Sequence, residues 1–263
     1  MKKLHFLFVL LLSFGIHSNA WASAGGVKII SYYEILLGYL GVHEHEMHDW
    51  VPAIGGLVTL FLLTLVGFLY KSRVERLGEN VCPDGRFSIR TIVETLLDFV
   101  SDLGKSLIGE KHYRSFLPLL CTLFLFIFVS NLTGLVPGFV PSTESINTNL
   151  AMGISVFLVY NFAGFKEHGS HYIQQFLGPV VFLMPLMLII ELVAHFARPI
   201  SLSLRLYGNI FGDHLVLSVF TGLTYLILPS FLLFFGLLVA SLQSFVFTLL
   251  SGIYISMAMS HDH

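Results

Sequence analysis

The sequence predicts an all-α integral membrane protein with about five membrane-crossing helices, an amphipathic interfacial helix, and two final helices that are long and strongly tilted. Of the 263 residues, 55% are hydrophobic and 11% are charged, whereas a soluble domain carries about 25% charged residues. Long uncharged runs recur along the chain, and each is long enough to cross a bilayer as a helix. Membrane lipid is therefore expected around the chain. The formal net charge of -2 argues against nucleic acid as a partner, because binding phosphates requires a basic surface.

Residues 1–24 have the layout of a secretory signal peptide. Two lysines precede a short apolar core, and small residues lead to a cleavage position after Ala22 or Ala24. The alternative is an uncleaved anchor, although the apolar core is short for a membrane span. Cleavage is the favoured interpretation, and it places the mature N-terminus and the segment 25–50 in the periplasm.

The segment 25–50 ends in a run of histidines and acidic residues. His43, His45 and His48 alternate with carboxylates, and imidazole and carboxylate groups together suit divalent metal ions. Their spacing matches no closed structural site. We therefore favour a solvated polar cap before the first membrane helix, with metal binding as the alternative.

A single membrane domain is expected over residues 51–263. Eight of the 14 Lys and Arg residues lie between positions 71 and 114, which indicates a cytoplasmic surface. Apolar residues recur at helical spacing over 88–109, opposite charged ones, and predict a helix lying on that surface. The predicted crossing helices are 51–71, 115–136, 146–165, 172–224 and 226–259. The last two are too long to cross without tilting or kinking, and the C-terminus is expected in the cytoplasm.

The segment 190–214 holds the charges of the last third of the chain. From position 172 to 260 the formally charged side chains are Glu191, Arg198, Arg205 and Asp213. A charge in lipid is costly, about 2.5 to 3.5 kcal/mol for Arg at a helix centre. These four residues are therefore functional candidates.

The same residues define one face of a helix. At 100° per residue, Glu191, Arg198, Ser201, Arg205 and Asn209 lie within about 40° of one direction, with Asp213 at about 80°. This polar stripe is about 33 Å long at the standard helical rise. A proton or ion path is the favoured interpretation, and a set of buried salt bridges between helices is the alternative.

The run from Arg198 to Asn209, Arg-Pro-Ile-Ser-Leu-Ser-Leu-Arg-Leu-Tyr-Gly-Asn, resembles the signature of subunit a of F-type ATP synthases. Residues 118–137 are similar to that family's central hairpin, and Ser241 to Phe247 are similar to its last helix. The resemblance implies a non-catalytic proton-channel and stator subunit without a cofactor, in a bacterial inner membrane. The implied partners are the oligomeric c-ring, the subunit b stator stalk and the rest of the ATP synthase complex.

The resemblance also implies which residues form the gate. Arg205 matches the essential arginine that faces the c-ring, and Asn209 and Gln243 match polar residues close to it. Arg198 and Ser201 are expected to support it. An arginine keeps its proton in proteins, so Arg205 can repel a cation or attract a carboxylate but cannot relay a proton. Such a group would block a direct leak between two half-channels.

Two access paths are implied beside this gate. Glu191 matches an acid of the cytoplasmic path, and His214 falls where the family has an acid or histidine of the outer path. Asp213 precedes His214, which leaves open which of the two relays the proton. Gly236 occupies a position that is ionisable in some relatives.

Two other classes of protein are alternatives to this function. A secondary transporter of a metal ion or proton is suggested by the histidines at 43–48, but the paired, inverted repeats typical of transporters are not evident. An intramembrane hydrolase would need a nucleophile or zinc motif, which the sequence lacks. No cluster of Na⁺ ligands is evident either, so the proton is the favoured coupling ion.

Overall fold

The computed structural model describes residues 31–39, 44–77, 89–136, 138–169, 184–223 and 227–259. The expected signal peptide at 1–24 lies outside these stretches. The start of the expected helix 172–224 and part of the segment 25–50 lie outside them as well.

The described part of the chain consists mainly of helices. They are α2 (Tyr32–Tyr39), α3 (Glu44–Leu77), α4 (Ile89–Ile108), α5 (Tyr113–Gly134), the 3-10 helix η1 (Ser142–Glu144), α6 (Ile146–His168), α8 (Met184–Leu223) and α9 (Ile227–Met259). Five of them, α3, α5, α6, α8 and α9, contain stretches that are long and apolar enough to cross a membrane. The predicted fold class is confirmed.

Helix α4 has one apolar face packed against the rest of the protein, and it also exposes both apolar and charged side chains. Val100 is buried against α5, while Ile92 and Phe99 are exposed. On the charged side, Lys105 Nζ donates a 3.0 Å hydrogen bond to Asp102, and this bond raises the pKa of Lys105. An amphipathic helix of this kind is suited to a membrane surface.

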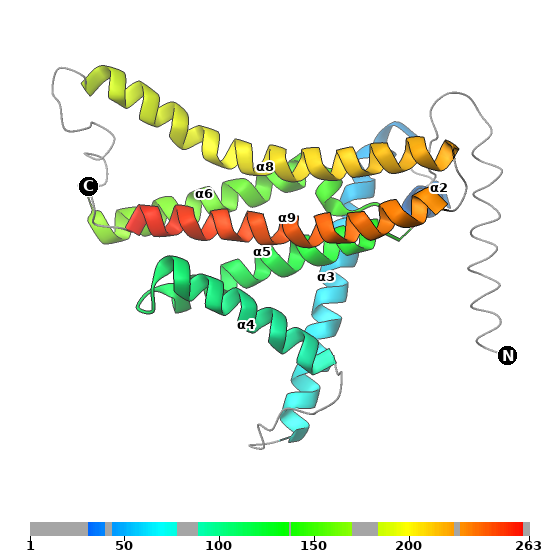
Figure 1. Ribbon diagram of the computed structural model, residues 1–263, viewed down its shortest axis with the longest axis horizontal. Helices are drawn as coiled ribbons and strands as arrows, with labels where there is room; N and C mark the ends of the chain where they lie inside the picture. The colour runs from blue at the N-terminus through cyan, green and yellow to red at the C-terminus, as the bar shows by residue number, and fades with distance from the viewer. Residues whose placement is uncertain are drawn as a thin grey trace.

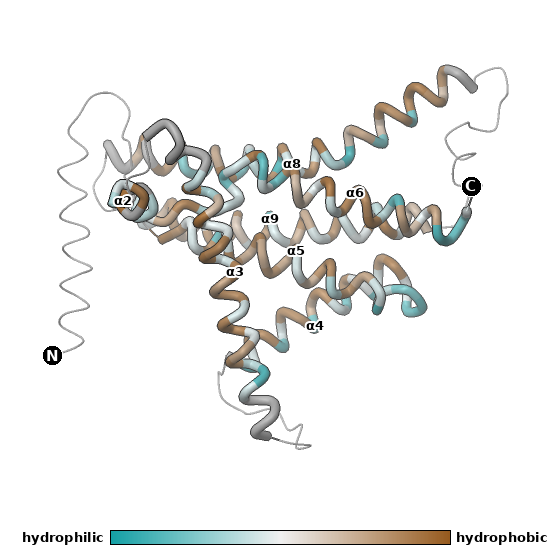
Figure 2. The backbone as a smooth tube through the Cα atoms, turned by 180° about the vertical axis from the view of Figure 1, so that it is seen from behind, coloured by the Kyte–Doolittle hydropathy of each residue, from teal (hydrophilic) through white to brown (hydrophobic). Residues whose placement is uncertain are grey.

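Helices α5, α6, α8 and α9 lie alongside one another, and α3 crosses them steeply (Figure 1). Helix α5 packs mainly on α9, and α6 packs mainly on α8. Figure 2 shows that apolar residues cover most of these helices, while hydrophilic residues gather at the ends of α4 and α6. Lateral apolar surfaces with polar ends are what a lipid environment requires.

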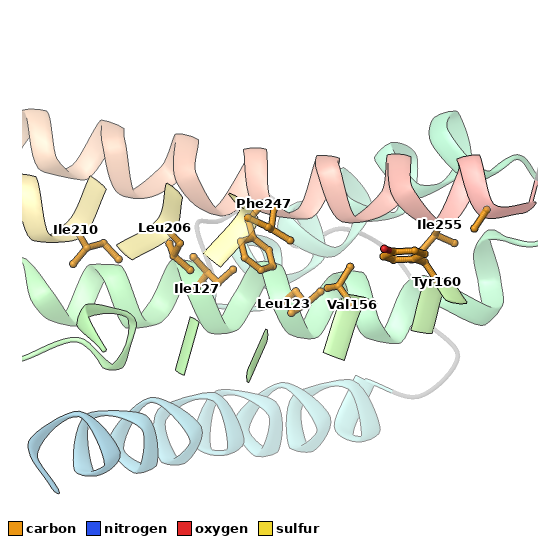
Figure 3. Close-up of a cluster of buried hydrophobic side chains, with 10 residues drawn as sticks. Leu123, Ile127, Val156, Tyr160, Leu206, Ile210, Phe247 and Ile255 are labelled. Carbon is orange, nitrogen blue, oxygen red and sulfur yellow. The ribbon is translucent and has the colours of Figure 1, made fainter. Parts of the chain in front are cut away.

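The core lies between the four aligned helices. Figure 3 shows its side chains meeting between α5, α6, α8 and α9. Leu206 of α8 and Ile127 of α5 are 0% exposed, and Phe247 of α9 is 1% exposed. This packing fixes the rotation of α8, because burying Leu206 forces the neighbouring Arg205 to the outside.

Helices α8 and α9 are longer than a perpendicular membrane span requires. They have 40 and 33 residues, whereas about 20 are enough to cross the hydrocarbon. Pro199 lies inside α8, and the helix changes direction along its length (Figure 1). Proline bends helices because it lacks an amide hydrogen and its ring displaces the preceding turn.

Candidate functional site

The polar stripe of α8 lies on the face turned away from the core. Ser201, Arg205 and Asn209 are exposed, while Leu202 and Leu206 between them are 2% and 0% exposed. Since this part of α8 is apolar enough to cross a membrane, bare lipid against these polar groups would be costly. A molecule that offers a complementary polar group to these side chains is the expected cover.

Arg205 is the cation at the centre of this stripe. Its side chain opens onto a shallow hollow that also includes Ile200, Ser201 and Leu204. Within the described residues, no carboxylate lies within ion-pair distance of Arg205, and no hydrogen bond to its side chain is formed. The guanidinium is therefore available to an acidic group that the described residues do not supply.

Asn209 links the stripe to the last helix. Its Nδ2 donates a hydrogen bond to Oε1 of Gln243 on α9. Gln243 is only 5% exposed, and its Nε2 is buried without a hydrogen-bond partner in the described structure. The structure thus brings together Asn209 and Gln243, one helical turn from Arg205.

A small cavity of about 30 Å³ lies beside this pair, between α5, α8 and α9. Its polar lining comprises Asn131, Asn209, Asp213, His214 and Gln243. The Nδ2 of Asn131, like the Nε2 of Gln243, is buried without a partner in the described residues. A polar cavity of this size has room for water, since about 10–15 Å³ of such space is enough for one molecule.

His214 and Asp213 have different surroundings, although they are adjacent in sequence. His214 Nδ1 lies 3.3 Å from Oε2 of Glu144, at the end of η1. Asp213 forms no ion pair with the described residues and borders the cavity. Gly236 also borders the cavity, and a Cβ there would lie 2.9 Å from Leu135 Cδ2, so a larger side chain would displace Leu135.

A buried hydrogen-bond network holds η1 in place. Ser142 Oγ lies 2.9 Å from Ser130 Oγ, and Thr143 Oγ1 donates to Asn131 Oδ1 at 2.7 Å. Asn149 Nδ2 donates to the carbonyl of Thr143 at 2.7 Å. Ser142 and Thr143 are 0% exposed, so the turn that carries Glu144 is anchored to both α5 and α6.

The opposite end of the stripe carries Glu191 and Arg198. Glu191 Oε1 lies 3.7 Å from Arg198 Nη2, and Arg198 also lies over the ring of Tyr254, 5.8 Å from its centroid. Both charged side chains are partly exposed. The stripe therefore contains one ion pair along its own helix rather than a ladder of salt bridges between helices, at least among the described residues.

The histidine-rich segment adds no described site. His43 lies outside the described residues, and the side chains of His45 and His48 are not described either. Among the side chains that are described, no group of three potential metal ligands comes together.

Glu144 and Asn131 are site residues that reasoning from the sequence did not assign. Glu144 is the one formal charge between Arg114 and Lys166. Its isolation in an apolar hairpin is the sequence feature that could have marked it as a candidate site residue. Asn131 gave no comparable signal, because a polar residue near a helix end is common. Its position in the cavity depends on how α5 packs against α8 and α9.

The fold and the site together define an ion-conducting membrane protein, with a helix face that carries an arginine unpaired by the described residues between two polar ends. The profile of the family described as "ATP synthase A chain" matches residues 54–256. This covers more than half of the chain, and the chain therefore belongs to the ATP synthase A chain family.

Individual relatives agree with this assignment. ATP synthase subunit a of Bdellovibrio bacteriovorus is 46% identical over 222 residues, which cover 81% of this chain and 96% of the relative. ATP synthase subunit a 2 of Syntrophotalea carbinolica is 42% identical over 223 residues, covering 85% and 88%. ATP synthase subunit a of Trichlorobacter lovleyi is also 42% identical over 223 residues, covering 84% and 94%.

Family membership supports the function expected from the sequence, that of a proton-channel subunit in the membrane sector of an F-type ATP synthase. A secondary transporter is not favoured. The crossing helices and the bacterial relatives make the chain a multi-pass protein of a bacterial inner membrane.

Proposed function

We propose that Arg205 is the gate between two proton half-channels and that this chain is a non-catalytic stator beside a rotating c-ring. The observation that carries the proposal is the position of Arg205, exposed at membrane level with no carboxylate of the described chain beside it. A guanidinium cannot give up its proton. It therefore attracts a deprotonated carboxylate of the ring and repels a proton that would cross directly.

The c-ring is the proposed cover of the stripe. Exposed apolar side chains accompany Ser201, Arg205 and Asn209: Leu204 lies on the same helix, and Leu242 of α9 precedes Gln243, the partner of Asn209. A ring surface of apolar helices with one mid-membrane carboxylate per subunit would match this pattern. Subunit b is the second proposed partner, as the stalk that keeps the chain from rotating with the ring.

The outer half-channel is proposed to run past Glu144, His214 and the cavity. Carboxylate and imidazole groups exchange protons readily when their surroundings are suitable. The 3.3 Å contact between Glu144 and His214 supports this pair as the entry step. Asp213, at the cavity with Asn209 and Gln243, is proposed to act after it, nearer the ring.

The inner half-channel is proposed to pass Glu191. This carboxylate is partly exposed, and Arg198 holds it at 3.7 Å on the same helix. With the N-terminus in the periplasm and the C-terminus in the cytoplasm, Glu191 lies towards the cytoplasmic side of Arg205 and His214 towards the periplasmic side. Each proton crossing 100 mV then carries about 2.3 kcal/mol to the rotation.

Replacement of the gate tests the proposal. In whole complexes reconstituted into lipid vesicles, Arg205→Ala is expected to abolish ATP-driven proton pumping while ATP hydrolysis by the detached soluble part continues. Arg114→Ala is the matched control, since Arg114 is an exposed cation at the start of α5, away from the stripe. Undiminished pumping by the Arg205→Ala complex would contradict the proposal.

A further inference from the structure

The bend of α8 leaves one main-chain oxygen without its usual donor. In a helix the carbonyl of residue i accepts a bond from the amide of residue i+4, and Pro199 has no amide hydrogen. The carbonyl affected is that of His195, which is only 6% exposed and lies within a membrane-spanning stretch. An unbonded carbonyl in such a place is costly.

Helix α6 supplies the missing donor. The hydroxyl of Tyr160 lies 3.5 Å from the carbonyl oxygen of His195, to which it can donate a long hydrogen bond. Tyr160 is 1% exposed and belongs to the core shown in Figure 3. Its ring also packs edge-on against the imidazole of His195, with the centroids 5.4 Å apart. Ring packing and hydroxyl donation therefore act on the same residue.

The next residue of α6 holds the side chain of His195. Asn161 Nδ2 donates to the carbonyl of Phe157 at 2.8 Å, which turns its Oδ1 towards His195 Nε2 at 2.9 Å. A carbonyl oxygen only accepts hydrogen bonds, so His195 Nε2 carries the proton in this contact. Tyr160 and Asn161 thus hold both the backbone and the side chain of one residue just before the bend.

Helix α6 also holds α8 just after the bend. Ser203 Oγ lies 2.9 Å from the carbonyl of Asn149, to which it can donate. A Cβ on Gly153 would lie 2.8 Å from the carbonyl oxygen of Pro199, so the two backbones are close there. The direction of α8 is therefore set against α6 on both sides of Pro199.

We propose that Tyr160 and Asn161 are positioning residues of the proton path, acting through the bend at Pro199. Glu191 lies one turn before His195, and Arg205 lies beyond the bend. A fixed bend holds the inner acid in a defined place relative to the gate. The inference rests on the proposed function, because the alignment of Glu191 with Arg205 matters only if both serve proton transfer.

A double-mutant cycle tests the role of the hydroxyl in whole complexes reconstituted into vesicles. Tyr160→Phe is expected to lower proton pumping per ATP hydrolysed by about threefold, the scale of one net hydrogen bond. Pro199→Ala returns an amide donor to the carbonyl of His195, so adding Tyr160→Phe to it is expected to have no further effect. The proposal is overturned if Tyr160→Phe lowers pumping equally in the wild-type and Pro199→Ala chains, or if it does not lower pumping in the wild-type chain.

Two further variants separate positioning from packing. Tyr254→Phe removes a hydroxyl that forms no hydrogen bond within the described structure, and it is expected to leave pumping unchanged. His195→Gln keeps a donor for Asn161, whereas His195→Leu does not. Retention of pumping by His195→Gln and its loss in His195→Leu is the expected result, and equal loss in both contradicts the proposal.

A distance measurement keeps this test apart from that of the proposed function. Spin labels at Leu188 of α8 and Phe162 of α6, both exposed, report the angle between the helices in a complex whose native cysteines are replaced by serine. Tyr160→Phe is expected to broaden the distance distribution. An unchanged distribution overturns the proposal that Tyr160 fixes the position of α8 against α6, even if pumping falls. Undiminished pumping by Arg205→Ala would instead remove the proposed function, whatever the labels report.

Discussion

Oε2 of Glu144 lies 3.3 Å from Nδ1 of His214, which joins the turn before α6 to the far part of α8. About a third of each side chain is exposed, so water reaches both. The turn itself is held by Ser142 and Thr143, which are fully buried and hydrogen-bonded. The carboxylate is thus held by a turn that is itself anchored by buried hydrogen bonds.

Neutralising this carboxylate is expected to impair proton transport. Glu144→Gln keeps the shape but removes the charge and the proton-binding capacity. ATP-driven pumping in vesicles should fall at least about tenfold, because a positioned acid or base contributes about a hundredfold to a proton transfer. Glu167→Gln, at an exposed acid on the last turn of α6, is the control and should change nothing.

The double variant of Glu144→Gln with His214→Ala shows whether the two residues act as a unit. Residues in one network give non-additive effects, so the double variant should be little worse than the more impaired single variant. Full additivity would assign them to separate steps.

Asp213 and His214 are expected to differ in their effects, since they face different surroundings. Asp213→Asn replaces a carboxylate with a neutral amide at the cavity shared with Asn209 and Gln243, while His214→Ala removes the partner of Glu144. Initial rates of ATP-driven pumping should therefore fall unequally. Equal and negligible losses would remove both residues from the path.

Gln243 is expected to matter through both ends of its amide. Oε1 accepts from Asn209, and Nε2 is a buried donor without a hydrogen-bond partner among the described residues. Gln243→Leu leaves Asn209 without this acceptor and makes the cavity less polar, so pumping should fall several-fold. Ser241→Ala is the matched control on α9, because its hydroxyl bonds only to Leu237 of the same helix. A Gln243→Leu complex that pumps like the wild type would contradict this role.

The sequence was sufficient for the fold class and for the face of α8 that carries Arg205. Charge scarcity and helical spacing are local properties, and they predicted that Ser201, Arg205 and Asn209 share one face, which the structure shows to be exposed. Glu144 could not be assigned in this way. Its contact with His214 depends on how η1 is held between α5 and α6, and such packing has no periodic signal in the sequence. The same holds for Tyr160, whose partner is a main-chain carbonyl.

Gly153 is expected to be a position where even one methyl group disturbs the site. A Cβ there would clash with Ser203 Oγ and lie 2.8 Å from the carbonyl oxygen of Pro199. Gly153→Ala should therefore separate α6 from α8, at a cost of about 1–3 kcal/mol for an overpacked core, and lower the thermal stability of the assembled complex. Gly67→Ala is the control, since nothing lies within 4 Å of the added Cβ. Equal stability of the two variants would show that the helices separate freely.

Tyr33 is expected to dock α2 through its ring and not through its hydroxyl. The residue is 5% exposed and packs edge-on against Phe139, with ring centroids 5.7 Å apart. Its hydroxyl is buried without a partner in the described residues, and this burial raises the pKa of Tyr33, so the group stays neutral at physiological pH. An unbonded buried hydroxyl costs about 1–3 kcal/mol.

Tyr33→Phe should therefore leave the rate of amide hydrogen exchange in α2 unchanged or make it slower. Tyr33→Ala should make this exchange at least about tenfold faster, because removing a packed ring costs several kcal/mol. Hydrogen exchange on the whole complex, read by mass spectrometry on peptides covering α2, provides the measurement. Tyr39→Ala is the matched control, since that ring is 90% exposed. Faster exchange in Tyr33→Phe would mean that the hydroxyl has a stabilising partner after all, and that α2 is held by a polar contact.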